Sequence, residues 1–111
     1  MVQIVMPIQK CTDDNFAKVI SSPTLTLIDF FATWCAPCKA LSPVLEDLSE
    51  ELKDKVTIYK LDIDESPNAA SAKAVRGVPT LMLFKSNELV GSQVGYTDRE
   101  HLRKWILAKS G

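Results

Sequence analysis

LTLIDFFATWCAPCK, residues 25–39, joins an apolar run to a pair of cysteines three positions apart. The nearly continuous apolar run is typical of a strand buried on both faces in a parallel sheet, which we predict over 25–31. After the second cysteine, leucines and valines recur at helical spacing, so we predict a helix from Cys35 to about Leu52. Pro43 should kink this helix, because its ring lacks an N–H and crowds the preceding turn. The cysteine pair is therefore expected at a junction between a strand and a helix.

Strands and helices alternate on both sides of this junction. We predict helices that begin near residues 12, 67 and 97, and further strands over 2–8, 56–61, 80–84 and 88–94. Strands separated by helices pair in parallel through right-handed crossovers, whereas the short connection at 85–88 requires an antiparallel hairpin. The pattern predicts an α/β fold with a mixed sheet and helices on both faces, in a single domain over residues 1–111.

The predicted helix starts carry side chains that suit helix capping. Thr12 precedes the first helix, and Ser66 is followed by Pro67, which fits the first helical position. Thr97 and Glu100 have the spacing of a capping box for the last helix. We expect these hydroxyls to accept the unpaired N–H groups of the first helical turns.

Composition and charge exclude several classes of function. The chain has 111 residues, with 13 Lys or Arg and 14 Asp or Glu, so its formal net charge is −1. It therefore has no general electrostatic attraction to nucleic acid or to an anionic membrane surface. No apolar run approaches the roughly 20 residues that span a bilayer, and the first ten residues lack the basic segment of a signal peptide. The three cysteines are too few for a disulfide scaffold, so we expect a cytosolic chain in which one pair is reactive.

The Cys35-Ala36-Pro37-Cys38 motif predicts a reversible disulfide. Residues three apart in a first helical turn lie about 5–6 Å apart at Cα, a separation that suits a disulfide. Unpaired N–H groups and the partial positive charge of a helix N-terminus favour a thiolate. Cys35 is the better placed and the more exposed of the two, so we expect it to be the nucleophile. Cys38, one turn inward, would attack the mixed disulfide and release the reduced substrate.

The cysteines have two alternative uses, a zinc site and inert thiols. A zinc site needs two further ligands, for which Cys11 and His101 are the other strong candidates, and neither lies in a paired motif. Alternatively, the paired thiols are buried and inert. We expect Cys11 to be a small buried apolar residue, with a regulatory thiol as the alternative, and His101 to be solvated.

Two separated motifs carry a resemblance to a known family. LIDFFATWCAPCK at residues 27–39 and RGVPTLMLF at 76–84, together with Gly95, resemble the thioredoxin family from about Cys11 to the C-terminus. The resemblance implies the thioredoxin fold, with a central five-stranded mixed sheet of order 1-3-2-4-5 flanked by four helices. It also implies a protein-disulfide reductase that uses Cys35 and Cys38 and holds no cofactor or metal of its own. We expect this reductase to be a cytoplasmic monomer. Its partners would be disulfide-containing client proteins and thioredoxin reductase, which supplies electrons from NADPH.

Asp29 interrupts the apolar run of the buried strand. Burial disfavours a charged carboxylate, so we expect its pKa to be raised, which suits proton transfer as Cys38 becomes a thiolate. The resemblance implies this role for Asp29, with Lys60 matching a lysine beside it. The alternative is that Lys60 extends to the surface and that the sheet merely tolerates Asp29.

A set of small and apolar residues is expected to form the substrate-binding surface around Cys35. By resemblance, Pro79 is cis and packs against the cysteines, and the backbone of Val78 pairs with an extended substrate segment. The alternative is an ordinary trans proline that opens a strand. The full set comprises Trp34, Ala36, Pro37, Gly77, Val78, Pro79, Val94 and Gly95.

The sequence also departs from the family, and two rival functions follow. Ala36 stands where most members have glycine, and Phe31 replaces a frequent tryptophan; we expect Ala36 to change redox poise or partner choice modestly. One rival is an oxidase or isomerase domain of the protein disulfide isomerase type, but such domains more often carry a histidine between the cysteines. The other rival is a binding module in which the thiols are incidental.

Overall fold

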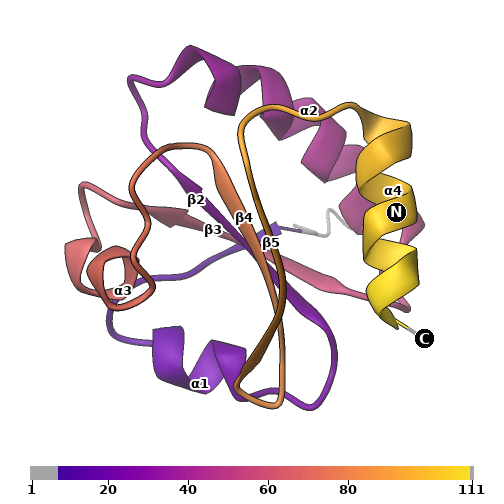
Figure 1. Cartoon of the computed structure of the whole chain (residues 1–111), viewed down its shortest axis with the longest axis horizontal. Coiled ribbons are helices and arrows are strands. Elements are labelled where there is room, and N and C mark those ends of the chain that lie inside the picture. Colours follow the sequence, from indigo (N-terminus) through magenta and orange to yellow (C-terminus); the bar gives the residue numbers. More distant parts are fainter. Residues whose placement is uncertain (1–7, 111) are drawn as a thin grey trace, which may run out of the picture.

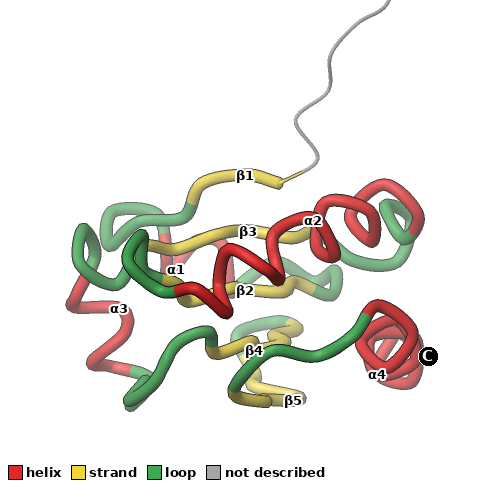
Figure 2. The backbone as a smooth tube through the Cα atoms, turned by 90° about the horizontal axis from the view of Figure 1, so that it is seen from above, coloured by secondary structure: helices red, strands yellow, loops and turns green. Residues whose placement is uncertain are grey.

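A mixed sheet forms the centre of the molecule in the computed structural model, which describes residues 8–110. The strands are β1 (Ile8–Lys10), β2 (Thr26–Phe31), β3 (Thr57–Asp62), β4 (Thr80–Lys85) and β5 (Glu88–Val94). They lie in the order β1-β3-β2-β4-β5, which Figure 2 shows from above. β1, β3 and β2 are parallel, and β4 is antiparallel to both β2 and β5. The predicted fold class and strand order are confirmed.

Helices cover both faces of the sheet, and each face has its own apolar core. The helices are α1 (Phe16–Ile20), α2 (Ala36–Glu51), α3 (Pro67–Ala72) and α4 (Arg99–Ser110). α2 and α4 pack on one face and α1 and α3 on the other (Figure 1). Alternate residues of β2 enter the two cores, Leu27 with α2 and Ile28 with α1. No helix within residues 8–110 has the length and apolar character needed to cross a membrane.

The strand predicted over 2–8 falls mostly outside the described residues, and the described part of β1 runs further along the chain than predicted, from Ile8 to Lys10. α2 is assigned as one helix through Pro43, so the kink expected there stays a prediction. The rest of the predicted order agrees with the structure.

The cap predicted for α3 was wrong, because its acceptor comes from a distant loop. Asp13 accepts hydrogen bonds from the backbone N–H groups of Asn68 (3.2 Å) and Ala69 (2.8 Å) at the start of α3. Ser66 makes no capping bond of its own; its buried hydroxyl instead accepts the backbone N–H of Asp13 at 3.1 Å. The segment around Asp13 and the start of α3 thus satisfy each other's backbone N–H groups. The negative charge of Asp13 also suits the positive end of the helix.

Two further helices begin later than predicted. α1 begins at Phe16, because the backbone after Thr12 first forms a separate turn, in which the Thr12 hydroxyl accepts an N–H two residues on. At the last helix, Asp98 rather than Thr97 is the cap, and its carboxylate accepts the backbone N–H of His101 at 2.9 Å. Thr and Asp are both good caps, so the sequence pattern alone does not choose between neighbours.

α4 contacts α2 near its start and β5 near its middle. Near its start, Arg99 and Arg103 both donate to the carboxylate of Glu51 at the end of α2. Further along, Trp105 is half-buried and lies directly over Gly91 of β5. A Cβ added at Gly91 would stand 2.9 Å from the Trp105 ring, which is closer than real contacts allow. The glycine is therefore required by the packing of α4.

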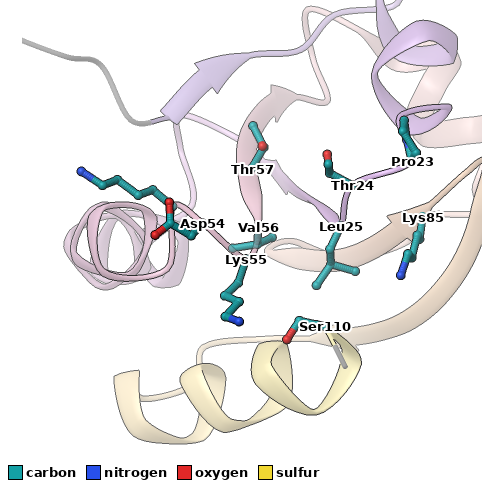
Figure 3. Close-up of a pocket in the computed structure, with 10 residues that line it drawn as sticks. Pro23, Thr24, Leu25, Asp54, Lys55, Val56, Thr57, Lys85 and Ser110 are labelled. Atoms are coloured by element: carbon teal, nitrogen blue, oxygen red, sulfur yellow. The ribbon is translucent and has the colours of Figure 1, made fainter.

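The end of the sheet opposite the cysteines carries a hollow of about 370 Å³. It opens where α2 and α4 end and where β3 begins, and Lys55 and Lys85 lie at its edge (Figure 3). None of the predicted site residues lines it. Lys55 is therefore a suitable distant control for changes of charge near the cysteines.

We predict that Gly91→Ala destabilises the protein by about 1–3 kcal/mol, because the new methyl group collides with the Trp105 ring. Urea unfolding at pH 7 measures this difference. Gly77→Ala is the matched control, because a Cβ there meets only Val94 Cγ1 at an ordinary 3.8 Å. Equal stability of Gly91→Ala and the parent would contradict the proposed packing.

Candidate active site

The two cysteines of the motif form a disulfide at the start of α2. Cys35 is the N-cap residue, with an extended backbone (φ −92°, ψ 112°), and Cys38 lies in the first helical turn. Their Cα atoms are 5.3 Å apart. Pro37 fits this turn because a proline there removes no hydrogen bond that the helix would make. The loop after β2 thus delivers both sulfurs to the positive end of a helix.

The hydrogen bonds around the pair distinguish the two sulfurs. The backbone N–H of Cys38 donates to Sγ of Cys35 at 3.2 Å, the bond expected of an N-cap side chain. In the reduced protein, the same N–H and the helix dipole would favour negative charge on Cys35 rather than on Cys38. The two sulfurs therefore lie in different chemical environments, and that of Cys35 suits a thiolate better.

Exposure, by contrast, does not distinguish the cysteines as predicted. Cys35 is 4% exposed and Cys38 is 3% exposed, so Cys35 is the more exposed of the two only by a margin too small to single it out. The reason is packing, because Ala32 and Val78 cover the pair. The carbonyl oxygen of Val78 lies 3.6 Å from Sγ of Cys35. The nucleophile is therefore distinguished by its hydrogen bonding and not by its exposed area.

Asp29 lies fully buried in β2, on the face that α2 covers. Neither carboxylate oxygen has a hydrogen-bond partner within the described residues. Burial raises the pKa of Asp29 from 3.8 to about 7, and the positive charge of Lys60 partly offsets this rise. The group can therefore hold or release a proton near neutral pH.

Lys60 is the parallel-strand neighbour of Asp29, but it does not bond to it. The two residues are in register on β2 and β3, and no ion pair within 4 Å joins them. The Lys60 ammonium instead donates to the Ser42 hydroxyl at 2.9 Å and lies 4.7 Å from the centre of the Phe31 ring. Lys60 thus acts on Asp29 through space. Ser42 was missed by the sequence analysis, because no local pattern links it to Lys60.

The predicted substrate-binding loops meet beside the cysteines. The Val78–Pro79 peptide bond is cis, and the backbone N–H of Gly95 donates to the carbonyl of Pro79 at 2.8 Å. Gly95 has φ +96°, which favours glycine, and a Cβ there would have open space around it. The loops after β2, before β4 and after β5 therefore gather at one end of the sheet, the upper end in Figure 1.

Several large apolar side chains of these loops are exposed. Trp34 is 67% exposed and Val94 is 70% exposed. Ala36 and Pro37, which follow Trp34 closely in the chain, are also exposed. Gly77 is exposed, Val78 is half-buried and Pro79 is buried. Exposed apolar groups beside a reactive sulfur form a suitable docking surface for a polypeptide.

Two residues of this region were missed by the sequence analysis. The indole N–H of Trp34 donates to the carboxylate of Asp64 at 2.9 Å, which fixes the direction of the ring. Asp64 follows β3, and no sequence signal relates it to Trp34. Tyr96 is 52% exposed and directly follows Gly95, a position from which an aromatic contact could have been inferred.

The residues weighed for other chemistry lie elsewhere. Cys11 is buried in the core under α1, on the other face of the sheet from α2, and burial raises the pKa of its thiol to about 11. His101 is exposed on α4. Within residues 8–110, no group of three or more His, Cys, Asp and Glu side chains is placed to hold a metal ion. The four candidate zinc ligands therefore do not converge.

Comparison with known proteins gives one consistent result. The sequence model of the Thioredoxin family matches residues 7–108. A thioredoxin of Rickettsia felis is 44% identical over 96 residues, which are 86% of this chain and 91% of the relative. A thioredoxin of Staphylococcus saprophyticus is 46% identical over 101 residues, 91% of this chain and 96% of the relative. A crystal structure of a Malassezia sympodialis thioredoxin matches with a TM-score of 0.86 and 34% identity, and the match covers 98% of each chain.

We predict that the burial of Asp29 makes the stability of the oxidised protein fall as pH rises. The native carboxyl keeps its proton up to about pH 7, whereas an unfolded chain releases it near pH 3.8. The native state therefore binds more protons between these values, and stability is lost across this window. Asp29→Asn, which carries no charge, should gain up to about 4 kcal/mol relative to the parent between pH 4 and pH 8.

Urea unfolding of both oxidised proteins across this pH range measures the effect. Exposed Asp54→Asn controls for the change in net charge. A difference between Asp29→Asn and the parent that stays constant with pH would contradict a raised pKa at Asp29.

Proposed function

The chain belongs to the thioredoxin family and is a protein-disulfide oxidoreductase, and on this premise we propose that it is a general reductant of client-protein disulfides. The observation that carries the proposal is the Cys35–Cys38 pair at the positive end of α2, beneath an exposed apolar surface. Thioredoxin reductase would return the pair to the dithiol form with electrons from NADPH. The family holds no cofactor of its own, so the chemistry belongs to the two cysteines.

In the first step, the Cys35 thiolate attacks one sulfur of a client disulfide. A bond forms between Cys35 and that sulfur, the client S–S bond breaks, and the other client sulfur leaves as a thiolate that takes a proton from water. The Cys38 N–H, which points at Sγ of Cys35, would stabilise the attacking thiolate beforehand.

In the second step, Cys38 resolves the mixed disulfide. Asp29 in its carboxylate form accepts the Cys38 proton, and the new thiolate attacks Sγ of Cys35. The Cys35–Cys38 disulfide forms, and the remaining client sulfur leaves as a thiolate. That thiolate then takes up the proton that Asp29 releases, so Asp29 is again a carboxylate and two electrons have passed from the dithiol to the client. The raised pKa of Asp29, about 7, suits a group that must accept a proton at neutral pH.

The client would bind in an extended form along the loop before β4. The backbone of Val78 would pair with the client in the manner of an added strand. Trp34 and Val94 would contact client side chains on either side, and Gly95 would let the client backbone approach. Within this proposal the protein acts as a cytoplasmic monomer.

We predict that Cys38→Ser accumulates mixed disulfides between Cys35 and its clients, because the second step loses its nucleophile. Incubation with an oxidised model client, followed by a nonreducing gel and mass mapping, detects the adduct. Cys35→Ser is the matched control and should trap nothing. Adducts through Cys38 in the control, or none through Cys35, would contradict the proposed order of attack.

We further predict that Asp29→Asn slows the second step on the order of tenfold or more at pH 7.5, since the proton of Cys38 loses its acceptor. Stopped-flow fluorescence of the mixed disulfide separates this step from the first. In the parent the rate should rise with pH through about 7, as Asp29 becomes ionised. An unchanged rate and pH profile in Asp29→Asn would remove Asp29 from the mechanism.

A further inference from the structure

Lys60 lines a groove beside the cysteines, and its ammonium has a hydrogen-bond partner there. The groove, of about 230 Å³, runs between the end of β2 and the first turns of α2. Within the described residues, the Ser42 hydroxyl is the acceptor that the ammonium has, at 2.9 Å. The Phe31 ring lies beneath it, 4.7 Å away at the ring centre. A lysine side chain is strongly hydrated and flexible, so this placement needs anchors.

Ser42 connects this anchored charge to the resolving cysteine. It lies on α2 one turn after Cys38, and its hydroxyl donates to the Cys38 carbonyl oxygen at 3.4 Å. The hydroxyl can therefore donate to the helix and accept from Lys60 at the same time. This arrangement directs its lone pair toward the ammonium.

The charge that Ser42 holds acts on the buried carboxyl of Asp29. From β3, Lys60 faces it in register; from β4, the opposite residue is apolar Leu81. From α2, the groove is lined by the paired Cys38 and, at its exposed edge, by Lys39. Lys60 is the group whose charge favours the ionised form of Asp29 against the effect of burial. The position of its ammonium therefore sets how far burial is offset.

We propose that Ser42 is a positioning residue, whose hydroxyl keeps the Lys60 ammonium in the groove and so sets the pH at which Asp29 ionises. Without the hydroxyl, the ammonium loses its acceptor and moves toward water, where its field at Asp29 is screened. The consequence for catalysis, a second exchange step tuned to neutral pH, rests on the proposed function. The effect on Asp29 itself does not.

The test is an NMR titration of the Asp29 carboxyl carbon in the oxidised protein, which needs neither client nor reductase. Lys60→Met should raise the Asp29 pKa by about 1, and Ser42→Ala should raise it by about 0.5 in the same direction. Ser42→Thr, which keeps a hydroxyl, should restore the parent value. In a Lys60→Met background, Ser42→Ala should add nothing, because no ammonium remains to be positioned.

The control is Lys55→Met, which removes the same charge at the far end of the sheet and should leave the titration unchanged. An unchanged or lowered Asp29 pKa in Ser42→Ala would overturn the proposal. A rise of equal size in the Lys60→Met background would also overturn it, because Ser42 would then act independently of Lys60. Failure of Asp29→Asn to slow the second exchange step would remove the proposed catalytic role but leave this titration result intact.

Discussion

Strand β2 is covered by helices on both of its faces, and the geometry of the redox site depends on this double burial. α2 and α4 cover one face and α1 and α3 cover the other, so the loops that carry the site lie at one end of the sheet and not on a face. β2 lies between parallel β3 and antiparallel β4, which places its last residue beside the first residues of β4. Cys35 and Val78 therefore meet without any long loop, and the end of β5 brings Gly95 to the same place. The burial that organises these loops also removes water from Asp29.

The surroundings of Cys35 favour a negative charge, whereas the surroundings of Asp29 disfavour one. At the start of α2, the N–H of Cys38 points at Sγ of Cys35, so a thiolate is favoured there. Beneath it, Asp29 has no hydrogen-bond donor, and burial favours its neutral form. Among the residues that the structure describes, Lys60, whose ammonium bonds to Ser42, supplies the charge that partly offsets the effect of burial. Because the pKa of Asp29 is about 7, a small change in the electric field at this carboxyl changes whether it holds its proton at neutral pH.

Features carried by long runs of sequence were predictable, whereas those made by single distant contacts were not. The apolar run of β2 and the helical spacing after Cys38 predict their elements, since burial on a regular period leaves a regular pattern. The polarity of the cysteine pair followed from helix geometry, whereas the strand order came from the resemblance to a family. The predicted cap of α3 was wrong because a helix cap needs only one acceptor. In α3 that acceptor is the carboxylate of Asp13, which is far away in the sequence. Ser42 and Asp64 were missed for the same reason, because their partners are neighbours only in the fold.

In the proposed reaction, the Cys35–Cys38 dithiol donates electrons to client disulfides, whereas an oxidase would donate its own disulfide to client thiols. The most direct measurement is the reduction potential of the pair, by equilibration in defined thiol–disulfide buffers with both redox forms quantified by mass spectrometry. Because Ala36 and Pro37 place no positive side chain between the cysteines, we predict a value near the roughly −270 mV that characterises thioredoxins. A value above about −200 mV would contradict it, because the pair would then act as an oxidant of thiols.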